Sequence, residues 1–219
     1  MIPLSLPPSA LRVLCVGAHT DDIEIGCGAT LLTIAQSHEI SATFVVATAV
    51  GERYEEALKA TSRFLPGADV SFRSFGLRDG FLPAQWGLVK EGLEEVARST
   101  VPDIVFGPRV DDAHQDHRVI AELLPTVWRD SLLFRYEIPK WDGDLGRVTH
   151  YVQVESEVAH RKIDLLDESF PSQTGRDWWD SETFLGLMRL RGLESRARYA
   201  EGFVVDKAVV ALDSVQPAR

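Results

Sequence analysis

Residues 11–22 read Leu11-Arg12-Val13-Leu14-Cys15-Val16-Gly17-Ala18-His19-Thr20-Asp21-Asp22, an apolar run that ends in one histidine and two carboxylates. The apolar run is typical of a strand that is covered on both faces. The polar residues after it predict the turn before a helix. Since ligands of open α/β sheets bind at the carboxyl ends of strands, we expect His19, Asp21 and Asp22 to lie at a functional site.

The same alternation of strand and helix patterns continues along the chain. Strands are predicted at residues 11–18, 40–48, 69–75, 103–107, 132–137 and 148–154, with a last one near 203–211. Helices are predicted at residues 22–37, 53–65, 86–99, 116–129, 157–168 and 179–197. This alternation predicts an α/β fold with a doubly wound, mostly parallel, Rossmann-like sheet and helices on both faces. Without a dividing linker, we expect one domain over residues 1–219, in which residues 1–10 are an N-terminal extension.

Composition narrows the class of protein. Hydrophobic residues make up 45% of the chain and charged residues 26%, as in ordinary globular proteins. The net charge of −10 argues against nucleic acid or an anionic membrane as a partner. No apolar window is long enough to span a membrane, and residues 1–10, which contain three prolines, do not resemble a signal peptide. We therefore expect a cytoplasmic protein.

A second polar motif follows a second apolar run. The segment Asp112-Ala113-His114-Gln115-Asp116-His117 comes shortly after the run at residues 104–107. First-row divalent metals accept imidazole and carboxylate ligands, and a catalytic site uses three protein ligands. His19, Asp22 and His117 would supply two imidazoles and one carboxylate to one ion. Metal-assisted amide hydrolysis also needs a base and a group that stabilises the oxyanion.

Each motif alone has an ordinary structural explanation. A pair of aspartates before a helix is most often an N-cap with a second carboxylate that the helix dipole favours. Asp111 and Asp112 could serve the next helix in the same way, and a single histidine near a strand end is usually a satisfied polar residue. The two motifs together, at two strand ends of one α/β pattern, favour the metal site.

At these residues the chain resembles the PIG-L/LmbE-like zinc N-deacetylases. The segment 17–31 resembles the first motif of that family, Ala-His-Pro-Asp-Asp followed by Glu and a glycine-rich helix start. The segment 112–117 resembles the second, His-Pro-Asp-His with an aspartate two residues before it. The chain departs from the family at Thr20 and Gln115, where proline is common, and at Ala29, where glycine is usual.

The resemblance implies a role for each residue of the two motifs. It makes His19, Asp22 and His117 the metal ligands and Asp21 the general base. It makes a protonated His114 the group that stabilises the tetrahedral intermediate, oriented by Asp116. Arg53 and Asp79 fall where the family binds its substrate, usually an N-acetylated amino sugar or glycoside. The implied cofactor is Zn²⁺, with Fe²⁺ or another divalent metal as alternatives.

These residues predict a metal-dependent hydrolase that removes an N-acyl group, in the first instance acetyl, from an amino sugar or glycoconjugate. Its partner would be that small molecule, an N-acetylglucosamine derivative for example, with a homo-oligomer as an open option. One alternative is an amidase on a larger conjugate, such as a thiol-sugar adduct or an antibiotic precursor. A non-haem Fe(II) oxygenase also uses two histidines and one carboxylate, and a sugar-binding module on the same fold is a third reading. Loops 139–147 and 171–180 carry tryptophans that are candidates for stacking on a sugar ring.

Overall fold

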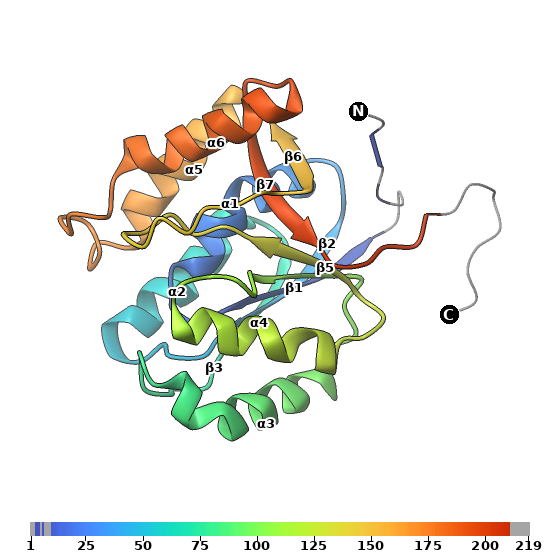
Figure 1. The fold of residues 1–219 in the computed structure, drawn as a ribbon, viewed down its shortest axis with the longest axis vertical. Helices are drawn as coiled ribbons and strands as arrows, with labels where there is room; N and C mark the ends of the chain where they lie inside the picture. The colour runs from blue at the N-terminus through green and yellow to red at the C-terminus, as the bar shows by residue number, and fades with distance from the viewer. Residues whose placement is uncertain (1–2, 5, 7–9, 211–219) are drawn as a thin grey trace.

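A seven-stranded sheet runs through the centre of the molecule (Figure 1). The computed structural model describes residues 3–4, 6 and 10–210. Within them the strands are β1 (Leu11–Gly17), β2 (Ile40–Val46), β3 (Asp69–Ser74), β4 (Ile104–Pro108), β5 (Leu132–Tyr136), β6 (His150–Val154) and β7 (Tyr199–Val205). Their order across the sheet is β3-β2-β1-β4-β5-β7-β6.

Strand β1 lies at the point where the strand order reverses. From β1 the chain builds β2 and β3 to one side, and it then returns to add β4 on the other side of β1. These pairs and the β4–β5 pair are parallel, whereas β7 is antiparallel to both of its neighbours. The carboxyl ends of β1 and β4 therefore flank the crevice in which such sheets bind ligands. The predicted fold class is confirmed.

Helices cover both faces of the sheet. The described helices are α1 (Asp22–Ala35), α2 (Gly51–Phe64), the 3₁₀ turn η1 (Leu82–Gln85), α3 (Trp86–Ala97), α4 (Gln115–Val127), α5 (Ser156–Ser169) and α6 (Ser181–Ser195). Apolar residues of α1, α2, α5 and α6 pack in one buried cluster with one face of the sheet. Those of η1, α3 and α4 pack in a second cluster on the opposite face (Figure 1). Because successive side chains of a strand point to opposite faces, β1 contributes residues to both clusters.

Helix α1 is broken in the middle, and a buried ion pair satisfies both ends of the break. Cys27 has φ −142° and ψ 16°, outside the helical region. The Lys162 ammonium donates to a carbonyl oxygen at the end of the first half (2.5 Å). The Glu201 carboxylate accepts from the backbone amides of Ala29 (3.0 Å) and Thr30 (2.7 Å) in the second half, and it lies 2.6 Å from Lys162. Because a helix end leaves backbone groups without partners, this pair stabilises the break.

Two glycines let neighbouring rings pack directly on the backbone of α1. A Cβ atom at Gly26 would enter the ring of Tyr136, and one at Gly28 would lie 2.6 Å from a ring carbon of Phe64. Both rings are fully buried, so neither has free space into which to move. The glycine-rich start of α1 is therefore a requirement of close packing.

The C-terminal strand lies earlier than predicted. Strand β7 spans Tyr199–Val205, whereas the apolar pattern predicted residues 203–211; residues 206–210 are not in a strand and residue 211 lies outside the described residues. The prediction failed because β7 contains Glu201, a charged residue whose burial depends on Lys162 and on two backbone amides of α1. Much of the predicted extension 1–10 (residues 1–2, 5 and 7–9) also lies outside the described residues, and the single domain stays a prediction. Among the described helices, none has the length and apolar composition needed to cross a membrane.

Candidate metal centre

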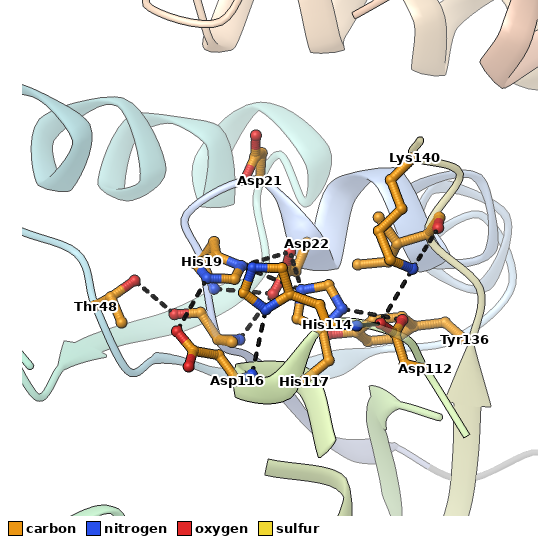
Figure 2. Close-up of polar contacts among 12 residues, drawn as sticks. His19, Asp21, Asp22, Thr48, Asp112, His114, Asp116, His117, Tyr136 and Lys140 are labelled. Atoms are coloured by element: carbon orange, nitrogen blue, oxygen red, sulfur yellow. Dashed lines mark hydrogen bonds and ion pairs between the residues drawn. The ribbon is translucent and has the colours of Figure 1, made fainter. Parts of the chain in front are cut away.

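Both polar motifs lie at the carboxyl edge of the sheet, where β1 and β4 end (Figure 2). His19 lies in the turn after β1, and Asp22 is the first residue of α1. His114 caps the N-terminus of α4, and His117 lies in its first turn. The parallel pairing of β1 with β4 sets the two strand ends side by side, so the histidines meet although they are far apart in the sequence.

Three donor atoms form a nearly regular triangle. His19 Nδ1 lies 3.1 Å from His117 Nε2 and 3.5 Å from Asp22 Oδ1, and His117 Nε2 lies 3.3 Å from the same oxygen. Two ligands of a tetrahedral ion with bonds of about 2.0–2.1 Å stand about 3.3 Å apart. The three residues therefore fit one divalent ion of this kind. Their roles as ligands stay a prediction.

Backbone hydrogen bonds fix the Asp22 carboxylate. Its Oδ2 atom accepts from the amides of Ala18 and His19, both at 2.8 Å. This leaves Oδ1 facing the two imidazoles (Figure 2). Asp22 is only 3% exposed, so its orientation is set before any ion arrives.

Asp112 orients His117 from the side opposite the triangle. Its Oδ2 lies 3.0 Å from His117 Nδ1, which leaves His117 Nε2 free to bind an ion. Its Oδ1 accepts from the His114 amide (2.8 Å) and lies 3.0 Å from Lys140 Nζ. The sequence identifies Asp112 as the aspartate at the start of the second motif and as a candidate helix cap. It does not predict that Asp112 orients His117. Lys140 lies in a distant loop, and no sequence signal pointed to it.

The Asp116 carboxylate contacts His19, whereas only the backbone amide of Asp116 contacts His114. Its Oδ2 lies 3.4 Å from His19 Nε2 and accepts from the Gly80 amide at 2.7 Å, while its Oδ1 accepts from the Leu82 amide at 3.0 Å. The expected contact between the Asp116 carboxylate and His114 is therefore replaced by one that orients a predicted ligand. The reason is that a carboxylate in the first turn of α4 faces the backbone of residues 80–82.

His114 is a hydrogen-bond acceptor at Nδ1. This atom accepts from the backbone amide of Asp116 at 3.2 Å and so caps α4. Burial, and then the positive charge of His19 and His117, lower the pKa of His114. These facts favour a neutral imidazole with its proton on Nε2, in place of the protonated ring that the sequence suggested.

Arg53 and Asp79 join the site around Asp21. Arg53 Nη2 donates to Asp21 Oδ1 at 3.3 Å, and Arg53 Nη1 lies 3.7 Å from Asp79 Oδ2. Asp79 Oδ1 in turn lies 3.1 Å from His19 Nε2. Burial raises the pKa of Asp21 although Arg53 opposes this, and Asp21 Oδ2 is buried without a hydrogen-bond partner among the described residues. A carboxylate with a raised pKa and a free oxygen is suited to accept a proton.

The carboxylates make the cluster favour positive charge. Burial lowers the pKa of His117, but Asp22 and Asp112 outweigh burial and raise it to about 9. The pKa of His19 is raised in the same way, against burial, by Asp22, Asp116 and Asp79. A field that favours a proton on these imidazoles also favours a metal cation in their place.

A second arrangement of ligands uses all three histidines. Ring nitrogens of His19, His114 and His117 lie within 4.8 Å of one another. The triangle that includes Asp22 has edges of 3.1, 3.5 and 3.3 Å, which match the spacing of ligands around one ion. These distances favour Asp22 as the third ligand, and His114 lies next to the predicted ligands.

The sequence matches a known family over half its length. Residues 14–128 match the family model PIG-L, described as GlcNAc-PI de-N-acetylase. A curated relative, the uncharacterised deacetylase YaiS of Escherichia coli (strain K12), is 28% identical over 156 residues. That match covers 65% of this chain and 83% of YaiS.

Solved structures share the fold. The N,N'-diacetylchitobiose deacetylase from Pyrococcus horikoshii superposes with a TM-score of 0.67 and 22% identity, over 89% of this chain and 83% of that one. GalB, the 4-carboxy-2-hydroxymuconate hydratase from Pseudomonas putida KT2440, gives 0.72 and 16% identity, over 94% and 100% of the two chains. Since one neighbour is a deacetylase and the other a hydratase, the fold alone does not fix the reaction.

Proposed function

The chain belongs to the PIG-L family (GlcNAc-PI de-N-acetylase), and we propose that it is a metal-dependent hydrolase that removes an N-acyl group, in the first instance acetyl, from an amino sugar or glycoconjugate. The observation that carries this proposal is the triangle of His19, Asp22 and His117 with Asp21 beside it. Family membership favours this reading over an Fe(II) oxygenase. A larger amide conjugate stays the alternative substrate.

His19, Asp22 and His117 would hold the ion, and Zn²⁺ suits this set of two imidazoles and one carboxylate. A divalent ion held there would lower the pKa of water and polarise a carbonyl group. Fe²⁺ would fit the same ligands.

Asp21 takes the proton of the attacking water. The pKa of Asp21 is raised toward neutral pH, and a general base is most effective when its pKa lies near the working pH. Arg53 holds one oxygen of Asp21 and leaves the other for this task. Asp21 can then return the proton to the leaving amine.

His114 donates a hydrogen bond from Nε2–H to the carbonyl oxygen as that oxygen becomes negative. The Asp116 amide fixes the tautomer, because it donates to Nδ1, which then carries no proton. A neutral donor that is fixed in advance stabilises an oxyanion without reorganisation.

Arg53 and Asp79 are suited to bind sugar hydroxyl groups. Their side chains are 32% and 56% exposed, so both can reach a bound molecule. Together they offer guanidinium donors and carboxylate acceptors, which match the hydroxyls of an amino sugar.

The test is an assay of amine release by purified, zinc-loaded protein with N-acetylglucosamine, N,N'-diacetylchitobiose and N-acetylated glycosides. We expect release that stops on chelation and returns with zinc. Asp21→Asn should keep the metal and lose nearly all activity. His114→Ala should keep the metal and turn over about 10²–10³-fold more slowly, whereas His38→Ala, a histidine remote from the site, should match wild type.

Three outcomes would contradict the proposal. One is no amine from any N-acyl sugar or glycoside with metal-loaded protein. Another is loss of zinc in Asp21→Asn, which would make Asp21 a ligand. The third is full turnover by metal-loaded His114→Ala.

A further inference from the structure

Two tryptophan-bearing loops contact each other, and the first also contacts Asp112 of the candidate metal centre. They are the segments 139–147 and 171–180, here called the rim loops, and both project at the same end of the molecule (Figure 1). Trp141 in the first and Trp178 in the second contact each other edge to face, with ring centroids 6.1 Å apart and an interplanar angle of 63°. Neither ring takes part in the chemistry proposed above.

The first rim loop is tied to the residues that orient His117. Lys140 Nζ lies 3.0 Å from Asp112 Oδ1 (Figure 2) and 2.6 Å from Asp144 Oδ2. The same Asp144 oxygen accepts from the Ala113 amide at 2.7 Å. Trp141 follows Lys140 directly in the sequence, so the position of its backbone is set by this contact with the site.

The second rim loop is tied to the helix that carries Arg53. Ser172 donates to Glu56 of α2 twice, from its amide (2.8 Å) and from its hydroxyl (2.5 Å). Glu56 lies one helical turn after Arg53, the residue that holds Asp21. One rim loop is therefore anchored on Asp112, and the other on the helix that carries Arg53.

Trp178 is partly buried against the core, whereas Trp141 is exposed to solvent. Trp178 packs edge to face on Trp179, with centroids 5.5 Å apart, and Trp179 is buried and donates to Asp167 Oδ1 at 2.8 Å. Trp141, in contrast, is 70% exposed. An indole held at the rim of a site with its surface open to solvent offers an apolar face for a flat ligand.

We propose that Trp141 and Trp178 form a binding site for a second pyranose ring, one that is joined to the N-acylated sugar of the substrate. A pyranose has an apolar face that stacks on an indole and an edge of hydroxyls. Exposed Asp142, Arg176 and Asp177, the sequence neighbours of the two tryptophans, suit that edge. An acyl chain would gain nothing from these charged groups. The site therefore selects a disaccharide or longer glycan over a single N-acyl sugar.

This proposal rests on the function proposed above, and the test separates the two. Amine release is measured with N-acetylglucosamine and with N,N'-diacetylchitobiose, and the readout is the ratio of kcat/KM for the disaccharide to that for the monosaccharide. Trp141→Ala should lower this ratio about tenfold, mainly through KM, since an aromatic contact and its buried area are lost. Trp141→Phe should keep most of it. Leu193→Ala, which removes an exposed apolar side chain on α6, should leave the ratio as in wild type.

Binding is measured in parallel by calorimetry with zinc-loaded Asp21→Asn. In this background Trp141→Ala should raise Kd for the disaccharide about tenfold. If both sugars are deacetylated and Trp141→Ala lowers both kcat/KM values equally or leaves both unaltered, the pyranose site is refuted and the deacetylase stands. If wild type releases no amine but Trp141→Ala still weakens disaccharide binding, the deacetylase fails and the pyranose site stands. An effect of Trp141→Ala on alkyl glycosides but not on the disaccharide would also refute the pyranose assignment.

Discussion

Replacing Asp112 with asparagine tests how the second motif prepares His117 to bind a metal. Both oxygens of Asp112 are engaged: Oδ1 faces two donors, the His114 amide at 2.8 Å and Lys140 at 3.0 Å, while Oδ2 faces His117 Nδ1 at 3.0 Å. An asparagine must place its carbonyl oxygen toward the two donors. Its NH₂ group then donates to His117 Nδ1, which moves the imidazole proton to Nε2, the atom that should bind the ion.

The magnitude follows from this geometry. Loss of the carboxylate partner of a metal-bound histidine weakens metal binding about 10–100-fold, or about 1.4–2.7 kcal/mol. Asp112→Ala leaves the His117 tautomer free and should lie near the lower limit. Asp112→Asn imposes the wrong tautomer and should lie at or above the upper one, although it is the more conservative change in shape.

The assay is competition for zinc between each variant and a chromophoric chelator at pH 8, with the fold checked by circular dichroism. Asp111→Asn is the matched control, because Asp111 is exposed and contacts Arg109 (2.6 Å). It should bind zinc like wild type. The reasoning is refuted if Asp112→Asn binds zinc as tightly as wild type, or more tightly than Asp112→Ala.

Three further predictions concern stability. Gly26→Ala should lower stability by about 1–3 kcal/mol, because the added methyl enters a buried ring; Gly186→Ala on α6, whose Cβ meets nothing within 4 Å, should not, and equal Tm values for the two would argue against the packing explanation. Lys162→Met should cost about 3–5 kcal/mol in urea unfolding by leaving the Glu201 charge buried; adding Glu201→Gln should recover part of this, and a further loss would contradict the ion-pair explanation. Hydrogen bonds from Thr183 and Glu182 at the start of α6 lower the pKa of the Asp180 carboxyl below the ordinary 3.8. Because these bonds stabilise the fold only while the carboxyl is ionised, Asp180→Ala should lower Tm at pH 7 and differ less from wild type below pH 3.8. A difference in Tm that does not change with pH would contradict this explanation.

Local patterns predicted the fold because they are readable over a few residues. Apolar runs of strand length alternated with helical patterns, and this alternation implied a mostly parallel sheet, as the structure confirms. The strand ends then predicted which polar side chains would gather, and His19, Asp22 and His117 do lie together. The last strand was placed too late because its buried charge, Glu201, has no local explanation.

The two motifs by themselves determined where the candidate metal site lies and which residue types surround it, because parallel strands bring their carboxyl ends to one edge. Only the tertiary structure decided which atom faces which. It paired Lys140 with Asp112 and turned Asp116 toward His19. The reason is physical: hydrogen bonds and ion pairs depend on distances of about 3 Å between segments far apart in the chain, and no periodicity along the sequence records those distances.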